Sequence, residues 1–138
     1  MALPSVGGGY QVGDGLVGEM QMATQIEPAT ATSTATLTTA QVLTGLILGS
    51  PGSSAAAYTM PTVALLEATL TQAKINSSFQ LAVINVDGSG SGVITMTGGG
   101  STGWTIVGLA TVAATAGTAA LFRARKTSAT AWSLYRIG

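Results

Sequence analysis

The chain lacks cysteine and histidine, and only ten of its 138 residues are charged. Without cysteine there are no disulfides and no thiolate chemistry, and the redox compartment stays undetermined. Without histidine the chain has no side chain that normally carries protons near neutral pH. A chain of this length ordinarily has about 34 charged residues. We therefore expect much of the surface to face something other than water.

The few charges are segregated along the chain, which their sum of zero conceals. Those up to position 70 are all acidic, and only one acidic residue follows. This asymmetry is typical of a nucleic-acid-binding patch, but an acidic segment of one subunit lying near basic strands of another explains it equally well. The acidic residues are Asp14, Glu19, Glu27, Glu67 and Asp87, and the basic residues are Lys74, Arg123, Arg125, Lys126 and Arg136.

Short apolar runs separated by glycine-rich or polar turns fill the second half of the chain. Turn residues recur about every 8 to 12 positions, which is the spacing of an antiparallel sandwich or barrel. For a chain with the length of one domain, this pattern predicts an all-β fold: an antiparallel, jelly-roll-like β-sandwich with one or two short helices. The expected strands are Phe79–Val86, Val93–Thr97, Trp104–Val112, Leu121–Lys126 and Trp132–Ile137.

Residues 1–28 form a separate, glycine-rich segment, with six glycines in the first eighteen positions. Its apolar side chains follow no sustained period, so they cannot bury enough surface to offset the entropy lost on ordering. The segment is either a disordered terminus or an arm ordered by a partner, and its apolar residues favour the arm. We therefore expect an extended arm, 1–28, and a β-sandwich domain, 29–138. The candidate binding residues of the arm are Tyr10, Leu16, Val17, Met20, Met22 and Ile26.

Two short helices are expected ahead of the main strands. Thr39 is placed to cap a helix that ends at Gly49, although so short an apolar run also fits a buried strand. Ala55–Met60 is a further expected strand. Thr62 then opens the run V-A-L-L-E-A-T-L-T-Q-A-K, whose apolar spacing predicts a helix of about three turns.

The strand Phe79–Val86 is apolar on both faces. Ala82, Ile84 and Val86 alternate with an equally apolar set that begins at Phe79 and Leu81. A two-layer fold covers only one face of each sheet, so the second cover is a helix, the arm or a neighbouring subunit. Ala82, Ile84 and Val86 are accordingly the candidate oligomer interface.

No set of residues has the composition of a catalytic, cofactor or metal site. The carboxylates are solitary, and D-G-S-G-S-G from Asp87 lacks the further carboxylates of a calcium loop, so it predicts a hairpin turn. The glycine runs at Gly7 and Gly98 lack the G-K-[ST] ending of a phosphate loop. We expect no enzymatic activity, no metal and no cofactor.

Two stretches of the second half fit either a specialised role or ordinary strands. Arg123, Arg125 and Lys126, with nearby aromatic residues, fit a nucleic-acid face, but an amphipathic strand with a solvated basic face fits better. The uncharged stretch 104–122 has the length of a membrane-spanning helix, but its threonines and glycines favour strands joined by turns. We therefore expect neither a nucleic-acid partner nor a membrane.

A succession of short motifs over about 100 residues resembles small virion proteins of tailed bacteriophages. These motifs are L-T-T-A-Q-V-L-T-G from Leu37, Y-T-M-P-T from Tyr58, S-F-Q-L-A-V-I-N from Ser78, G-W-T-I-V-G from Gly103, and F-R-A-R-K-T with S-L-Y-R-I from Phe122.

This resemblance implies a head decoration, or cement, protein. Such proteins are β-sandwiches that assemble as trimers on the outer capsid surface, have no enzymatic activity and clamp capsomers through extended termini. The expected partners are the major capsid protein and further copies of the chain. Related sheets occur in fibre and tail proteins, so a module that binds a host glycan is the alternative.

Overall fold

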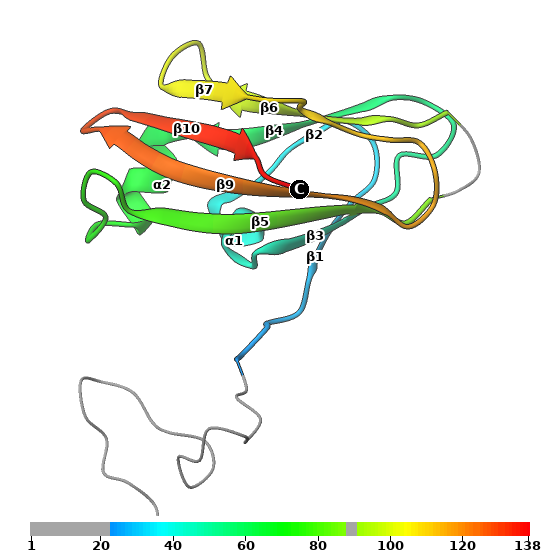
Figure 1. Cartoon of the computed structure of the whole chain (residues 1–138), viewed down its shortest axis with the longest axis horizontal. Coiled ribbons are helices and arrows are strands. Elements are labelled where there is room, and N and C mark those ends of the chain that lie inside the picture. The colour runs from blue at the N-terminus through cyan, green and yellow to red at the C-terminus, as the bar shows by residue number, and fades with distance from the viewer. Residues whose placement is uncertain (1–22, 88–90) are drawn as a thin grey trace, which may run out of the picture.

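Two β-sheets and two short helices make up residues 23–87 and 91–138, the part of the chain that this computed structural model describes (Figure 1). The mainly-β prediction is therefore confirmed. The six-stranded sheet has the order β1-β3-β5-β9-β10-β7, and the four-stranded sheet the order β2-β4-β6-β8. The strands are β1 (Ala29–Ala31), β2 (Ala35–Thr36), β3 (Leu46–Gly49), β4 (Ala56–Thr62), β5 (Ser78–Asn85), β6 (Ile94–Gly99), β7 (Trp104–Val107), β8 (Thr111–Val112), β9 (Thr118–Ser128) and β10 (Ala131–Arg136).

The expectation of antiparallel pairing is wrong for most of the described ladders. Five pairs are parallel and three are antiparallel. The cause is the path of the chain, because successive strands from β1 to β9 alternate between the two sheets. The chain therefore makes one full turn through both sheets, which we call a coil, before it adds the next strand to a sheet. That strand runs in the same direction as the one before it, as in β1-β3-β5 and β2-β4-β6.

Each of the first two coils contains one short helix. Helix α1 (Thr39–Leu43) begins at Thr38, whose hydroxyl accepts from the backbone N–H of Gln41 while the Gln41 side chain accepts from Thr38 N–H. This reciprocal pair satisfies two free N–H groups at the helix start. The helix is shorter than expected because Gly45 adopts a φ of 76°. The residues that follow form β3, so the strand alternative is confirmed for them.

Helix α2 (Val63–Thr69) repeats the arrangement one coil later. Thr62, expected to open this run, is its N-cap, and its hydroxyl accepts from the backbone N–H of Leu65. The helix has about two turns rather than three, because the backbone at Leu70 leaves the helical region. Val42 and Leu66, each four residues beyond a threonine cap, are both fully buried. They hold the two helices against the core.

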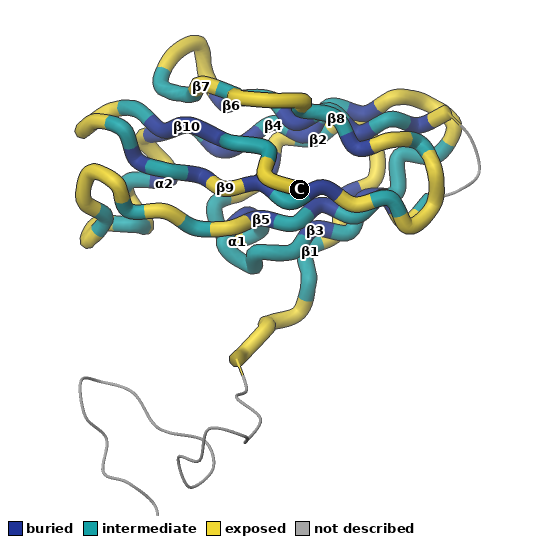
Figure 2. The backbone as a smooth tube through the Cα atoms, viewed as in Figure 1, coloured by how far each residue is buried: buried dark blue, intermediate teal, exposed yellow. Residues whose placement is uncertain are grey.

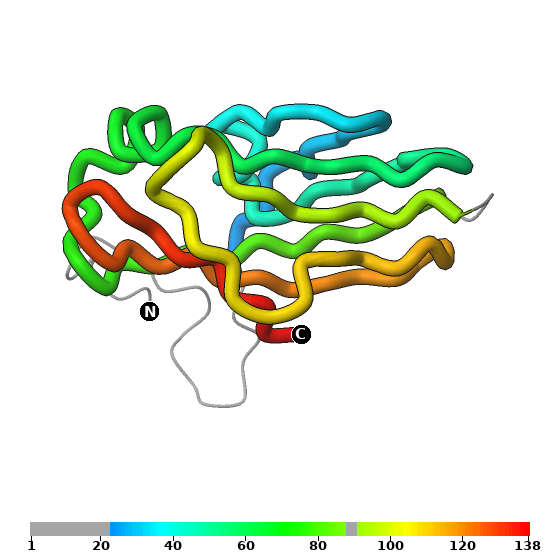
Figure 3. Tube along the Cα trace, turned by 90° about the horizontal axis from the view of Figure 1, so that it is seen from above, coloured from blue at the N-terminus to red at the C-terminus, as the bar shows by residue number. Residues whose placement is uncertain are grey.

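The core lies between the two sheets and draws on both (Figures 2 and 3). The side chains alternate along β5, so that Leu81 and Val83 are buried. Tyr58 on β4 is also buried, and its hydroxyl donates to the carbonyl oxygens of Ala31 and Thr32. The largest fully buried side chains are Trp132, Tyr58, Phe122, Leu37, Ile47, Met60, Leu66, Leu81, Ile94, Met96, Leu134 and Val42.

Two connections differ from the expected hairpins and strands. The segment after Asp87 joins β5 to β6, which belong to different sheets, so it does not close a hairpin. The run expected as one strand, Trp104–Val112, divides into β7 and β8 in different sheets, with Gly108 at a φ of 93° between them. Across 23–87 and 91–138, no helix has both the length and the apolar character needed to cross a bilayer.

Candidate functional site

The outer face of the six-stranded sheet carries the predicted interface residues. Ala82 and Ile84 are partly exposed, and Val86, just beyond the end of β5, is 49% exposed. The residues between them point inward, where Val83 and Asn85 are buried. The predicted division of this strand into two faces is therefore confirmed. Whether another subunit covers the outer face stays a prediction.

Neighbouring strands extend this apolar surface. In the ladder registers, Leu46 of β3 lies opposite Ala82, and Ala82 lies opposite Leu121 of β9. Directly opposed residues share a face of the sheet. The next row places Leu48 beside Ile84 in the same way. We call Leu46, Leu48, Ala82, Ile84 and Leu121 the apolar patch.

Neither helix covers the apolar patch. Figure 1 looks onto the outer face of the six-stranded sheet, and α1 and α2 lie behind it; Figure 3 shows the same arrangement from above. Both helices contact β4 of the other sheet. Of the three covers expected for the second face, the helix is therefore excluded for α1 and α2, which leaves the arm or a neighbouring subunit.

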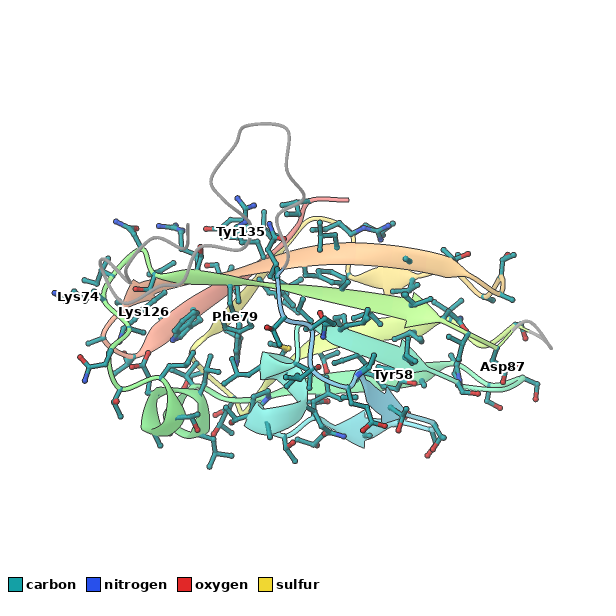
Figure 4. All side chains as sticks on the ribbon, turned by 90° about the horizontal axis from the view of Figure 1, so that it is seen from below. Tyr58, Lys74, Phe79, Asp87, Lys126 and Tyr135 are labelled. Carbon is teal, nitrogen blue, oxygen red and sulfur yellow. The ribbon has the colours of Figure 1, made fainter. Side chains whose placement is uncertain are left out.

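Basic side chains occupy the same outer face beyond the apolar patch. Arg125 donates through Nη2 to the hydroxyl of Tyr135 (2.8 Å) and through Nη1 to Oδ1 of Asn76 (2.8 Å). The guanidinium of Arg125 lowers the pKa of the Tyr135 hydroxyl through this hydrogen bond. Arg123 lies opposite Tyr135 in the β9-β10 ladder and is exposed. Figure 4 shows Tyr135 on the outer side of the sheet and Phe79 on the inner side.

Lys126 does not join this basic surface. It points inward from β9 and is buried, with Nζ 2.6 Å from Oε2 of Glu67 and 3.2 Å from the carbonyl oxygen of Ala73. Side chains alternate along β9, so only Arg123 and Arg125 point outward, as expected for an amphipathic strand, and a nucleic-acid face that includes Lys126 does not form. Arg136 also turns away, donating to the carbonyl oxygens of Thr111 and Gly138.

The carboxylate of Glu67 on α2 has side-chain partners on two strands of the six-stranded sheet. Its Oε1 accepts from Nε1 of Trp132 at 2.6 Å, and its Oε2 pairs with Lys126. The hydrogen bond from Lys126 is the main cause of a lowered pKa at Glu67, with Trp132 contributing further. Both carboxylate oxygens thus have structural partners within the domain.

A pocket of about 310 Å³ opens beside this group, between the helix ends and the start of β5. Trp132 forms part of its wall, with its ring centroid 5.7 Å from that of Phe79. The pocket contains no charged residue. Its lining residues are Leu43, Thr69, Leu70, Thr71, Gln72, Ala73, Ser77, Ser78, Phe79 and Trp132.

Within the described ranges, His, Cys, Asp and Glu do not gather in threes as metal ligands do. Of the predicted arm residues, Ile26 is described and is 56% exposed. Tyr10, Leu16, Val17, Met20 and Met22 lie outside the described residues, so the prediction for them stands as it was made.

Sequence reasoning missed two features of the site. Leu46 and Leu48 belong to the apolar patch, but their run was read first as a helix. The sequence signal that favours the strand is a short apolar run, L-I-L, bounded by Gly45 and Gly49. The contacts of Glu67 had no signal in the sequence, because its two side-chain partners are 59 and 65 positions away.

Comparison of the chain with protein-family models, with curated proteins and with solved structures finds no match.

Proposed function

We propose that this chain is a non-enzymatic structural protein of a bacteriophage virion. It is a capsid decoration, or cement, protein that assembles as homotrimers on the outer surface of the head. Its arm, residues 1–28, fastens it to the major capsid protein and stabilises contacts between capsomers. In this proposal the two sheets are the layers of a β-sandwich, with the parallel ladders described above in place of the antiparallel ones of a jelly roll.

The observation that carries the proposal is the apolar patch on an outer sheet face that neither helix covers. Patches of this kind mark interaction sites in proteins whose other surfaces are polar. The chain has ten charged residues in all, so few charges are available to keep such a face in water. The resemblance of the strand motifs to phage virion proteins adds the class of assembly.

Sedimentation with purified capsids tests the attachment. The full chain and a chain lacking residues 1–28 are each mixed with capsids that carry no decoration protein. β1 begins at Ala29, so the deletion leaves every described strand in place, and circular dichroism is expected to show a folded domain. The full chain is expected to sediment with the capsids and the shortened chain to stay in the supernatant. Equal sedimentation of both would contradict the role of the arm.

A fibre or spike module that binds a host glycan is the second candidate, and the pocket beside Trp132 favours it. Aromatic rings with neighbouring hydroxyl and amide groups, here Phe79 with Ser78 and Gln72, suit a sugar. Binding of glycans followed by tryptophan fluorescence, with Phe79→Ala as the comparison, distinguishes the candidates. Saturable binding that Phe79→Ala removes would favour the fibre module over the decoration protein.

A further inference from the structure

The outer face of the six-stranded sheet combines apolar and basic side chains and has no acidic ones in its strands. The charged residues within these six strands are Arg123, Arg125, Lys126 and Arg136, and only the first two point outward. Arg123 is exposed, and its side chain has no hydrogen-bond or ion-pair partner among the described residues. Leu121 of the apolar patch lies two positions before it on β9. The face is therefore apolar at its centre and positive at one side.

One segment of the chain has the complementary composition. Residues 10–27 contain three acidic residues, Asp14, Glu19 and Glu27, and no basic residue. Between the acidic residues lie large apolar side chains. A segment of this composition in extended form offers apolar side chains to the patch and carboxylates to the arginines. The large apolar residues of 10–27 are Tyr10, Val12, Leu16, Val17, Met20, Met22 and Ile26.

The described chain enters the domain at the edge of this same sheet. The carboxamide nitrogen of Gln25 donates to the carbonyl oxygen of Thr44 at 2.8 Å, two residues before Leu46 of the apolar patch. Residues 23–27 are exposed. Traced back from β1 to position 23, the chain extends outward beyond the β1 edge and away from both sheets (Figures 1 and 2).

The segment is long enough to cross the face. Thirteen extended residues, 10–22, span about 43 Å at about 3.3 Å each. Six strands at about 4.8 Å spacing make a face about 24 Å wide between the outermost strand axes. The whole apolar patch and both arginines therefore fall within the reach of one such segment.

We propose that residues 10–22 of one copy lie across the outer face of the six-stranded sheet of a second copy. The apolar side chains Leu16, Val17 and Met20 contact the apolar patch, and Asp14 and Glu19 face the Arg123 side. Each copy gives one arm and receives one, an arrangement that closes into a ring of identical contacts. The inference rests on the oligomer of the proposed function and narrows the role of the arm: Leu16, Val17 and Met20 bind the neighbouring copy instead of the capsid, and residues 1–9 remain for the capsid.

Cross-linking in the naturally cysteine-free chain tests the placement. Full chains carrying Met20→Cys are co-expressed with full chains carrying Ile84→Cys, and the purified assembly is treated with a short bismaleimide. Thr36→Cys, exposed on β2 of the other sheet, replaces Ile84→Cys as the matched control. We expect the mixed Met20–Ile84 pair to give a covalent dimer, and the Met20–Thr36 pair to give at least tenfold less.

Two cross-linking results would overturn the placement. Equal yields from Ile84→Cys and Thr36→Cys would show that the arm does not prefer this face. Cross-linking within single chains that carry both Met20→Cys and Ile84→Cys, with none between chains, would show that each arm covers its own sheet.

Charge reversal supplies a second readout that does not depend on register. Arg123→Glu is expected to raise the concentration at which the oligomer dissociates about fivefold, as removal of an exposed ion pair does. Combining it with Glu19→Lys is expected to restore the wild-type value. Additive losses in the combined variant would contradict the pairing. Capsid sedimentation of the cysteine variants separates the two proposals. Binding to capsids without cross-links between arm and sheet would contradict the placement of the arm on a second copy but not the decoration role. Cross-links without binding to capsids would contradict the decoration role but not the placement of the arm.

Discussion

The Nζ atom of Lys126 on β9 lies 2.6 Å from Oε2 of Glu67 on α2, although the two residues are 59 positions apart. The other carboxylate oxygen of Glu67 accepts from Nε1 of Trp132 on β10. One side chain thus connects the second helix to two adjacent strands of the six-stranded sheet. The side chain of Glu67 is 23% exposed, so water screens the ion pair only in part.

This contact makes the stability of the domain depend on pH. The pKa of Glu67 in the folded chain is below its ordinary value of 4.5, chiefly because of the hydrogen bond from Lys126. A lowered carboxyl pKa stabilises the fold above the ordinary value, and this contribution disappears as the pH falls through the folded pKa. We expect the wild type to lose this stability as the pH falls below the ordinary value of 4.5, and Glu67→Gln to lose less over the same range.

Urea unfolding at fixed protein concentration measures this difference. At neutral pH, Glu67→Gln is expected to cost about 1–2 kcal/mol, because Lys126 then lies buried without its counter-ion while Trp132 keeps an acceptor. Glu27→Gln, on the exposed segment before β1, is the matched control and should follow the wild type. A Glu67→Gln curve parallel to that of the wild type would show that the ion pair does not act on folding.

Removal of one buried hydroxyl is expected to loosen the edge of the six-stranded sheet. Tyr58→Phe removes this donor from the carbonyl oxygens of Ala31 and Thr32, and the Ala31 oxygen keeps only the backbone N–H of Ser50, at a cost of about 1–2 kcal/mol. Tyr135→Phe is the matched control, because its hydroxyl is on the outer face where water replaces it. The free energy of unfolding from urea titration decides between them, and equal losses in the two variants would contradict the role assigned to Tyr58.

The close approach of β4 and β6 gives a further test. A Cβ atom at Gly99 would overlap the carbonyl oxygen of Met60 and the backbone of Pro61, so Gly99→Ala is expected to cost about 2 kcal/mol. At Gly117 the φ is 79° and no atom lies within 4 Å of an added Cβ. Because asparagine tolerates this backbone conformation, Gly117→Asn should leave the melting temperature nearly unchanged. A similar drop in both variants would mean that crowding is not the cause.

The faces of the strands could be predicted from the sequence, but their partners could not. Alternation placed Ala82 and Ile84 on one face of the strand and Leu81 and Val83 on the other, because successive side chains of a strand point to alternate faces whichever strand lies beside it. Parallel or antiparallel pairing depends instead on whether the chain stays in one sheet or crosses to the other. Turn spacing is the same in both cases. It was read over residues 79–137, where three of the four ladders are antiparallel, and the antiparallel expectation fails at the ladders of β1 to β4, which are all parallel.

The helix starts could also be predicted, and the helix ends less well. A threonine before an apolar run is a local signal, and both helices begin with a threonine cap, Thr62 in α2 and Thr38 rather than Thr39 in α1. The helices end where the backbone leaves helical geometry, at Gly45 after α1 and at Leu70 after α2. The contacts of Glu67 depend on tertiary packing, for which there is no local signal.

The apolar patch is the basis of the central claim, and one substitution tests it against a matched position. Ile84→Asp places a charge in the patch, whereas Thr130→Asp places one in the exposed turn between β9 and β10. Thr127, expected in that turn, lies in β9 and donates to the carbonyl oxygen of Ala131, so it is a poorer control.

The most direct test is the particle mass of the wild type and of these two variants, measured by multi-angle light scattering at micromolar concentration. The account predicts a particle of three times the chain mass of 13.6 kDa for the wild type and Thr130→Asp. It predicts monomer or aggregate for Ile84→Asp, because a charge in the patch excludes the apolar partner. A monomeric wild type, or a trimer that Ile84→Asp leaves intact, would contradict it.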